Sequence, residues 1–256
     1  MGARLVTIPI SHFCEKARWA LDRAGVEYVE QPHVQVLHIA AARLAGGGRT
    51  VPVLVTATGE VLADSTDILR WTDTLLPPGR RLYPEGEAGD EAAALEAWLD
   101  DGFGPDGRLW MYHETLPVVG EMGQWALAGV PRWERPVFRV SRPVMDRVIR
   151  RYLGIDAAAA VAARERVEGV FDDVAARLSD GRRFLLGDRF TAADLAFAAL
   201  AAPMLLPPRY GSPLPPPEAM PEGPAREVRR LRAHPAGVFA ERLYDEERAR
   251  PAPARP

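Results

Sequence analysis

The sequence predicts an α/β domain followed by an all-helical domain. Across the first 76 residues, short apolar runs typical of strands alternate with segments whose apolar residues recur at helical spacing. Beyond a linker at residues 79–90 that is rich in glycine and charge, apolar residues recur only at helical spacing. We therefore expect a first domain at residues 1–78, a helical domain at residues 91–248 and a frayed tail at residues 249–256.

The first domain is predicted to have the element order β-α-β-α-β-β-α. Gly25 ends its first helix, because glycine readily adopts the left-handed conformation that stops a helix. Thr58-Gly59 forms the turn of a hairpin, and the last helix has an apolar face that includes Ile68 and Leu69. The predicted strands lie at residues 4–10, 26–30, 51–55 and 60–63, and the predicted helices at about residues 14–24, 38–48 and 65–76.

The second domain is predicted to contain several helices of different character. From Val167 to Leu178, apolar residues recur at positions i, i+3, i+4, i+7 and i+11, which places them on one helical face. Residues 195–202, "LAFAALAA", are apolar all round and predict a helix that is buried on all sides. A last helix is expected at residues 234–249.

Two proline-rich segments interrupt this helical domain, at residues 117–144 and 203–224. Proline lacks a backbone donor and is disfavoured inside helices, so we expect both segments to be ordered loops or short helical pieces. Trp125 and Trp133 lie in the first of them and are candidates to cover a pocket.

Composition excludes several functional classes. The hydrophobic fraction of 47%, the charged fraction of 26% and the net charge of −3 are those of an ordinary globular protein, so neither nucleic acid nor a membrane is an expected partner. A single cysteine excludes an intrachain disulfide and a Cys-based zinc site, and the five histidines lack metal-ligand spacing. Because of these cysteine and histidine patterns, we expect a protein without a metal. No segment resembles a signal peptide or a membrane span, so we expect the protein to be cytoplasmic.

The strongest local motif is "GDRFTAADLAF", residues 187–197. Thr191 and Asp194 have the spacing of a capping box, in which the Thr oxygen accepts the Asp194 amide and the carboxylate reaches back. Phe190 and Leu195 occupy the positions of a hydrophobic staple. This motif is predicted to be structural: it fixes the start of the buried helix.

Three shorter motifs in the first domain are candidates for a binding site. Pro52 opens a strand, and Ser65 after Asp64 is expected to cap the next helix, whose N-terminus can bind a carboxylate. Plain capping explains Ser65 equally well. Ser11 precedes Cys14 by three residues, the spacing of a CxxC pair that has lost its first cysteine.

These motifs occur together in one known family. The chain resembles the glutathione S-transferase superfamily, and in particular its serine-type, bacterial-like members, over nearly its full length. The resemblance rests on "SHFCEKARWAL", "TVPVL", "DSTDILRW", "FLLGDRFTAADLAFAAL" and "HPAGVFAERL", which stand in the family's order. It implies a thioredoxin-like domain that binds glutathione, a cis bond before Pro52, a helical domain that holds a small hydrophobic electrophile, and a homodimer.

The resemblance also implies roles for individual residues. Ser11 falls where serine-type members keep the hydroxyl that donates to the glutathione sulfur, and a helix N-terminus lowers the pKa of a nearby thiol. Nucleophilic attack requires the thiolate, so the bound thiol becomes reactive at neutral pH. Phe13 and Pro52 fall in the glutathione site, where the Val51 backbone pairs with the cysteinyl main chain as an added strand does.

The charged ends of glutathione have implied partners as well. Asp64 attracts the γ-glutamyl ammonium, and Ser65 with nearby amides binds the carboxylate beside it. His38 falls near the position of a basic group for the glycine carboxylate, or is simply exposed. Glutathione itself is implied by the family, and another low-molecular-weight thiol is an open alternative.

Several alternatives follow from the same residues. Cys14 is expected to be a small buried packing residue, but a thiol reductase or isomerase that uses Cys14 is an alternative function, as is a non-catalytic binding module. Lys16 and Arg18 are expected to be solvated or at a dimer interface. In the helical domain the resemblance implies an electrophile pocket lined by Trp110, Tyr112 and His113, with core packing as the competing interpretation.

Overall fold

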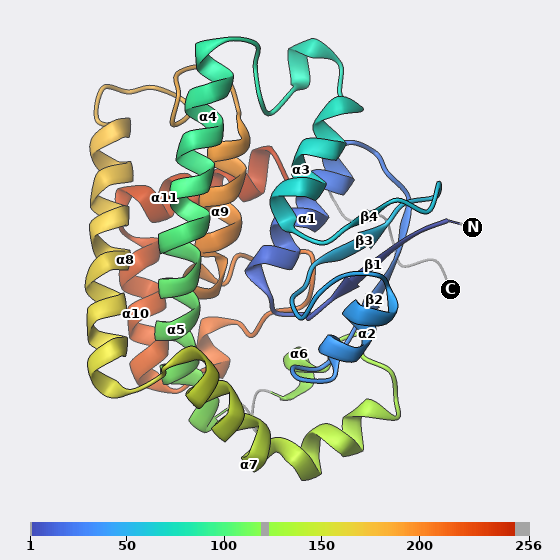
Figure 1. Cartoon of the computed structure of the whole chain (residues 1–256). Coiled ribbons are helices and arrows are strands. Elements are labelled where there is room, and N and C mark those ends of the chain that lie inside the picture. The colour runs from blue at the N-terminus through green and yellow to red at the C-terminus, as the bar shows by residue number, and fades with distance from the viewer. Residues whose placement is uncertain (1, 119–122, 249–256) are drawn as a thin grey trace.

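The computed structural model describes residues 2–118 and 123–248, and it confirms the predicted fold class. A four-stranded mixed sheet with its helices is followed by a helical domain (Figure 1). The elements of the first domain are β1 (Ala3–Thr7), α1 (His12–Arg23), β2 (Tyr28–Pro32), α2 (His38–Leu44), β3 (Val53–Val55), β4 (Val61–Leu62) and α3 (Ser65–Thr74).

The sheet has the strand order β2-β1-β3-β4. β1 is parallel to β2 and antiparallel to β3, and Leu5 pairs with both Glu30 and Leu54. Because successive strand residues point to opposite faces, Leu5 packs with α1 and α3 on one face, whereas Val6 packs with Ala42 of α2 on the other. The sheet is therefore covered on both faces.

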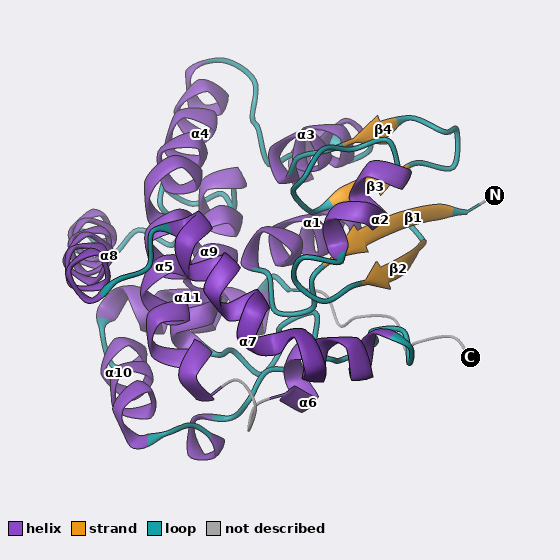
Figure 2. Cartoon of the chain, turned by 60° about the horizontal axis from the view of Figure 1, so that its bottom comes forward, coloured by secondary structure: helices purple, strands orange, loops and turns teal. Residues whose placement is uncertain are grey.

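The second domain is built around one buried helix. Every residue of α9 except Pro203 is buried, as its all-apolar sequence predicts, and α9 packs against α1, α4, α5, α10 and α11 (Figures 1 and 2). The helices of this domain are α4 (Glu87–Trp98), α5 (Gly104–Thr115), α6 (Gly123–Ala126), α7 (Glu134–Leu153), α8 (Ala157–Leu178), α9 (Ala192–Leu205), α10 (Glu222–Arg232) and α11 (Pro235–Glu246), with a π-helical turn, η2 (Leu99–Phe103), between α4 and α5.

The capping box forms at the start of α9. Asp194 Oδ2 accepts from the Thr191 amide and from the Thr191 hydroxyl, each at 2.8 Å, while Oδ1 accepts from the Leu185 amide at 2.8 Å. Phe190 and Leu195 are both buried in the core of this domain. The carboxylate therefore fixes the loop before α9 as well as the helix itself.

The expectation for the first proline-rich segment is wrong from residue 134 onward, because α7 is a helix of 20 residues that contains Pro136 and Pro143. Pro136 lies in the first turn, where an amide has no helical partner to lose. Pro143 removes one internal hydrogen bond, but Phe138 and Met145 on the same helix bury their side chains against Val34. Residues 119–122 and the tail at 249–256 lie outside the described residues.

Lys16 and Arg18 of α1 are buried in ion pairs, so the expectation of a solvated or interfacial position is wrong. The Lys16 ammonium lies 2.5 Å from Glu96 Oε1 of α4, and the Arg18 guanidinium lies 2.7 Å from Glu30 Oε1 of β2. Glu96 and Glu30 lie on other elements, so the sequence of α1 alone does not indicate that they pair with Lys16 and Arg18. Charge pairing thus allows α1 to be buried between the sheet and the helical domain.

Candidate active site

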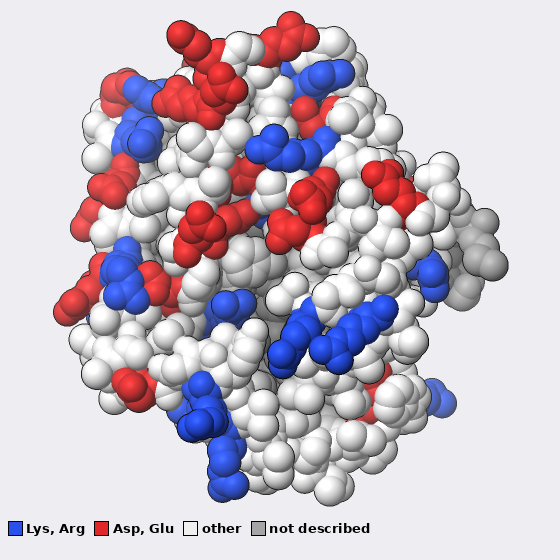
Figure 3. All heavy atoms as spheres, in the orientation of Figure 1, with Lys and Arg blue, Asp and Glu red and all other residues white. Residues whose placement is uncertain are grey.

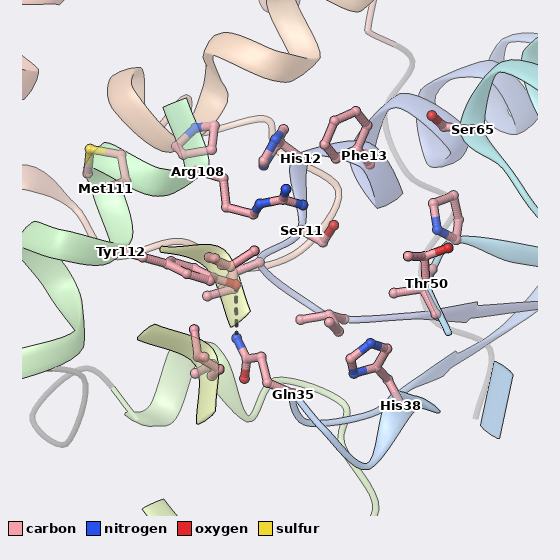
Figure 4. A pocket seen from close by; sticks show the side chains of 18 of the residues that line it. Ser11, His12, Phe13, Gln35, His38, Thr50, Ser65, Arg108, Met111 and Tyr112 are labelled. Carbon is pink, nitrogen blue, oxygen red and sulfur yellow. Dashed lines mark hydrogen bonds between the residues drawn. The ribbon is translucent and has the colours of Figure 1, made fainter. Parts of the chain in front are cut away.

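A cavity of about 620 Å³ lies between the two domains (Figure 4). The first domain contributes the start of α1 and the segments 35–39, 49–52 and 63–66, and the helical domain contributes parts of η2, α5, α6 and α7. This volume is in the range of small-molecule sites. The predicted site residues that line it are Ser11, Phe13, His38, Val51, Pro52, Asp64, Ser65 and Tyr112.

Ser11 is the N-cap of α1 and lies in the wall of the cavity. Its Oγ accepts from the Cys14 amide at 3.4 Å, a long hydrogen bond, and the Ser11 hydroxyl also forms a hydrogen bond with the Cys14 side chain. The open amides of the first turn and the positive end of the helix dipole face the same region. A sulfur atom placed beside Ser11 would therefore be stabilised as its anion.

Cys14 is fully buried and faces away from solvent. Burial raises the pKa of its thiol, which outweighs the opposing effects of Arg18 and of the hydrogen bond with Ser11. A protonated, inaccessible thiol is a poor nucleophile. The geometry thus favours the packing role expected for Cys14.

His12 and Phe13 connect the start of α1 to α5. His12 Nε2 donates to the Gly104 carbonyl at 3.1 Å, and burial, with a smaller effect from Arg108, lowers the pKa of His12 to about 3. The imidazole is therefore neutral at physiological pH. The Phe13 ring packs on Gly104, where a β carbon would lie 2.7 Å from the ring, so this glycine is needed for the close approach.

Val51 and Pro52 enter the cavity wall just before β3 begins at Val53, two residues later than predicted. The Val51–Pro52 peptide bond is cis. Val51 is half-buried and Pro52 is buried.

At the start of α3 the cap is Asp64 and not Ser65, so that detail of the prediction is wrong. Asp64 is extended, with φ −138° and ψ 152°, and its carboxylate accepts from the Thr66 amide at 2.7 Å. Ser65 is the first helical residue and is buried. Both still line the cavity, together with Thr66.

The cavity end at α3 is acidic. Two carboxylates, Glu96 and Asp100, share the single ammonium of Lys16, and the Thr66 hydroxyl lies 2.9 Å from each of them. Asp100 and the exposed Asp101 line the cavity beside Asp64. Figure 3 shows acidic side chains gathered over this upper part of the face and basic ones below it. This end of the cavity suits a cationic group.

At the opposite side of Ser11, the wall contains His38 and Thr50 (Figure 4), with Arg49 beside them. Burial lowers the pKa of His38, so its imidazole is neutral at physiological pH and is a poor partner for a carboxylate. Arg49 is exposed, and a guanidinium can bind a carboxylate through two hydrogen bonds, which makes Arg49 the better candidate partner for a carboxylate. The position of Arg49 just before "TVPVL" is the sequence feature that could have identified it as a partner for a carboxylate.

Only Tyr112 of the three predicted pocket aromatics lines the cavity, where its hydroxyl lies 3.5 Å from Gln35 Nε2. Trp110 is buried in the helical core, and His113 lies beside Glu114 outside the cavity. The physical reason is helical phase, because residues 110, 112 and 113 point in different directions at 100° per residue.

Helical phase also identifies α5 residues that the sequence did not indicate. Arg108, Met111 and Thr115 share one face with Tyr112 at spacings of three, four and seven residues, and all four line the cavity. Trp125 lines it too, whereas Trp133 is 61% exposed at the start of α7. The spacing of these α5 residues is visible in the sequence, but it indicates a shared face only when the bounds of the helix are known.

Neither a metal centre nor a membrane span is found in the part of the chain that the structure describes. No group of three or more His, Cys, Asp or Glu side chains in residues 2–118 and 123–248 is arranged to hold a metal ion. Within the same ranges, no helix combines the length and the apolar character required to cross a bilayer.

Solved structures with a similar fold are glutathione S-transferases. One from Ceriporiopsis subvermispora, in complex with glutathione, has 17% identity and a TM-score of 0.68, with 100% of both chains covered. One from Phanerochaete chrysosporium has 18% identity and a TM-score of 0.61, with 96% of this chain and 97% of the other covered. One from Methylobacterium radiotolerans, in complex with glutathione sulfonate, has 23% identity and a TM-score of 0.53, with 94% of both chains covered.

No curated protein sequence matches the chain. Two family models do: residues 5–79 match the glutathione S-transferase N-terminal domain, and residues 142–233 match the glutathione S-transferase C-terminal domain. The two matches lie in the family's order and together span more than half of the chain. The chain belongs to the glutathione S-transferase superfamily.

Proposed function

We propose that this protein is a glutathione transferase that activates the glutathione thiol at the start of α1. The observation that carries the proposal is the position of Ser11, whose hydroxyl and adjacent first-turn amides face a cavity between the two domains. The solved relatives with bound glutathione or glutathione sulfonate support the choice of thiol.

The charges around the cavity match those of glutathione. The γ-glutamyl ammonium suits the acidic end at Asp64 and Asp101, and the neighbouring carboxylate suits Ser65 and the N-terminus of α3. The glycine carboxylate suits Arg49 on the other side of Ser11. This orientation places the cysteinyl sulfur at Ser11, against the backbone before β3.

The reaction then needs no covalent bond to the protein. The thiol proton leaves to solvent, the thiolate is stabilised by the Ser11 hydroxyl, and the sulfur attacks the electrophilic carbon while the leaving group departs with its electron pair. Walls built from α5, α6 and α7 exclude water from the apolar substrate. A homodimer in the cytoplasm is part of the same proposal and is supported by family membership.

Binding of glutathione is the direct test of this function. A saturating concentration, about 100 times the Kd, adds about 2.7 kcal/mol to the free energy of unfolding, which a thermal-shift experiment detects as a raised Tm. Cysteinylglycine, which lacks the γ-glutamyl group, should give a clearly smaller shift. Other low-molecular-weight thiols in the same screen test the choice of glutathione, and equal shifts for all thiols would contradict the proposed orientation.

The Cys14→Ser variant separates this function from a reductase that uses Cys14. Since Cys14 is fully buried and burial raises the pKa of its thiol, we expect unchanged transfer of glutathione to an electrophile. Iodoacetamide should label Cys14 in urea but not in the folded wild-type protein. Loss of deglutathionylation or of dehydroascorbate reduction in this variant would instead support the reductase, and binding of glutathione without turnover would support a non-catalytic module.

A further inference from the structure

The helical side of the cavity contains one charged group that the proposed binding of glutathione does not use. Arg108 projects from α5 toward Ser11 (Figure 4). From Gly104 onward, it is the one charged side chain among the described residues that line the cavity.

None of the described residues neutralises Arg108. Asp106 on the same helix is held by Arg166 of α8 at 2.6 Å, and Asp100 is held by Lys16. Asp101 lies in the preceding π-helical turn η2 and also lines the cavity, but no ion pair joins it to Arg108 among the described residues. The Phe13 ring is a further neighbour, and its centroid lies 5.9 Å from the guanidinium carbon.

Arg108 is half-buried, and the other lining residues of the helical domain from Gly104 onward are mostly apolar. Partial burial of a charge is less costly when an opposite charge completes the site. His12 is neutral and cannot supply that charge. The apolar and aromatic lining residues of the cavity include Ile10, Met111, Trp125, Ile149, Leu214 and Met220.

We propose that Arg108 is a specificity-determining residue that binds an anionic group, of the carboxylate class, on the second substrate. The second substrate is then an apolar electrophile that carries a negative charge. A guanidinium can bind a carboxylate through two parallel hydrogen bonds, which orients the molecule as well as attracting it. This inference rests on the proposed transferase function and names its substrate class.

Glutathione's own glycine carboxylate is the competing occupant of Arg108. It is disfavoured because Arg49, the proposed partner of that carboxylate, directly precedes Thr50, and Figure 4 shows Thr50 and His38 on the other side of Ser11 from Arg108. If Arg108 bound glutathione, the Arg108→Met variant would show a raised KM for glutathione with any electrophile. That result would overturn the inference while leaving the transferase function intact.

A matched pair of electrophiles tests the inference: 4-chloro-3,5-dinitrobenzoate and its methyl ester. In both compounds, the S–C bond forms at the carbon that carries chlorine, and chloride leaves with the electron pair. The two compounds differ in the charge of the group on the opposite side of the ring. The readout is the ratio of kcat/KM for the acid to kcat/KM for the ester. We expect Arg108→Met to lower this ratio by about 10- to 100-fold, through KM, because hydrogen bonds to charged groups have this strength.

Two further variants act as controls. Arg108→Lys keeps the charge and should retain most of the ratio. Arg177→Met removes the same charge from an exposed position on α8, outside the cavity lining, and should leave the ratio unchanged. A ratio that is the same in Arg108→Met and wild type, or one that falls equally in Arg177→Met, would overturn the inference.

Binding without any thiol separates this inference from the proposed function. The wild-type protein should bind 2-naphthoate at least about 10-fold more tightly than methyl 2-naphthoate in a fluorescence titration, and Arg108→Met should lose this preference. The preference is expected even if no glutathione transfer is detected, in which case only the proposed function fails. Equal affinity for the acid and the ester would overturn the role of Arg108.

Discussion

The Ser11→Ala variant is expected to lower kcat for glutathione transfer by about 100-fold, with the fold intact. The size follows from the loss of one preorganised hydrogen-bond donor to a developing or existing anion in an active site. The Ser11 hydroxyl lies at the N-cap of α1, in the wall of the cavity. Steady-state kinetics at saturating glutathione measure the effect.

Two controls separate catalysis from helix capping. Loss of the Ser11 acceptor costs the α1 N-terminus about 1 kcal/mol, which a shift in Tm reports. Asp156→Ala removes an equivalent cap from α8, where the carboxylate accepts from the Ala159 amide at 2.8 Å, and should lower stability similarly without changing kcat. Ser11→Thr keeps the hydroxyl and should retain activity. An unchanged kcat in Ser11→Ala would remove Ser11 from the mechanism.

The Asp194→Ala variant is expected to have the largest effect on stability, a loss of about 3–5 kcal/mol in the free energy of unfolding. The substitution leaves the buried amides of Leu185 and Thr191 without an acceptor, and each such group costs about 1–3 kcal/mol. It also releases the loop that starts α9, the helix at the centre of the second domain. Urea denaturation monitored by tryptophan fluorescence measures the loss.

Asp194→Asn is the matched control, because it keeps one acceptor oxygen and should cost less than the alanine variant.

The contribution of Asp194 to the free energy of unfolding depends on pH with a defined sign. Burial raises the pKa of Asp194 to about 6 from its ordinary 3.8, so the folded state binds this proton more tightly than the unfolded state does. The contribution of this carboxyl to stability is therefore complete below pH 3.8 and falls as the pH rises through 6. An Asp194→Ala loss below 1 kcal/mol would contradict this account.

Features encoded by local sequence could be predicted. The element order of the first domain follows from alternating periodicities, and the all-apolar run at residues 195–202 correctly predicts a fully buried helix. The spacing of Thr191 and Asp194 predicts the two hydrogen bonds of a capping box, and the structure contains both. In each of these cases the interacting groups lie within a few residues of one another.

Features that depend on distant partners could not be predicted in the same way. Lys16 is buried because Glu96 and Asp100 of the helical domain pair with it, and nothing in the sequence of α1 indicates those partners. Pro143 lies inside α7 because tertiary burial of neighbouring side chains outweighs the loss of one hydrogen bond. Arg108 faces the cavity through the phase of α5, which could not be assigned before the helix start at Gly104 was known.

The most direct test of the central claim is the ionisation of glutathione bound to the protein. The thiolate absorbs near 240 nm, so a difference spectrum between the complex and its free components, recorded as a function of pH, gives the pKa of the bound thiol. The account predicts a value at or below about 7.5 in the wild-type protein, against about 8.5 for an unperturbed thiol, and a return toward about 8.5 in Ser11→Ala. A bound thiol that titrates near 8.5 in the wild-type protein, or one that titrates equally low without the Ser11 hydroxyl, would contradict it.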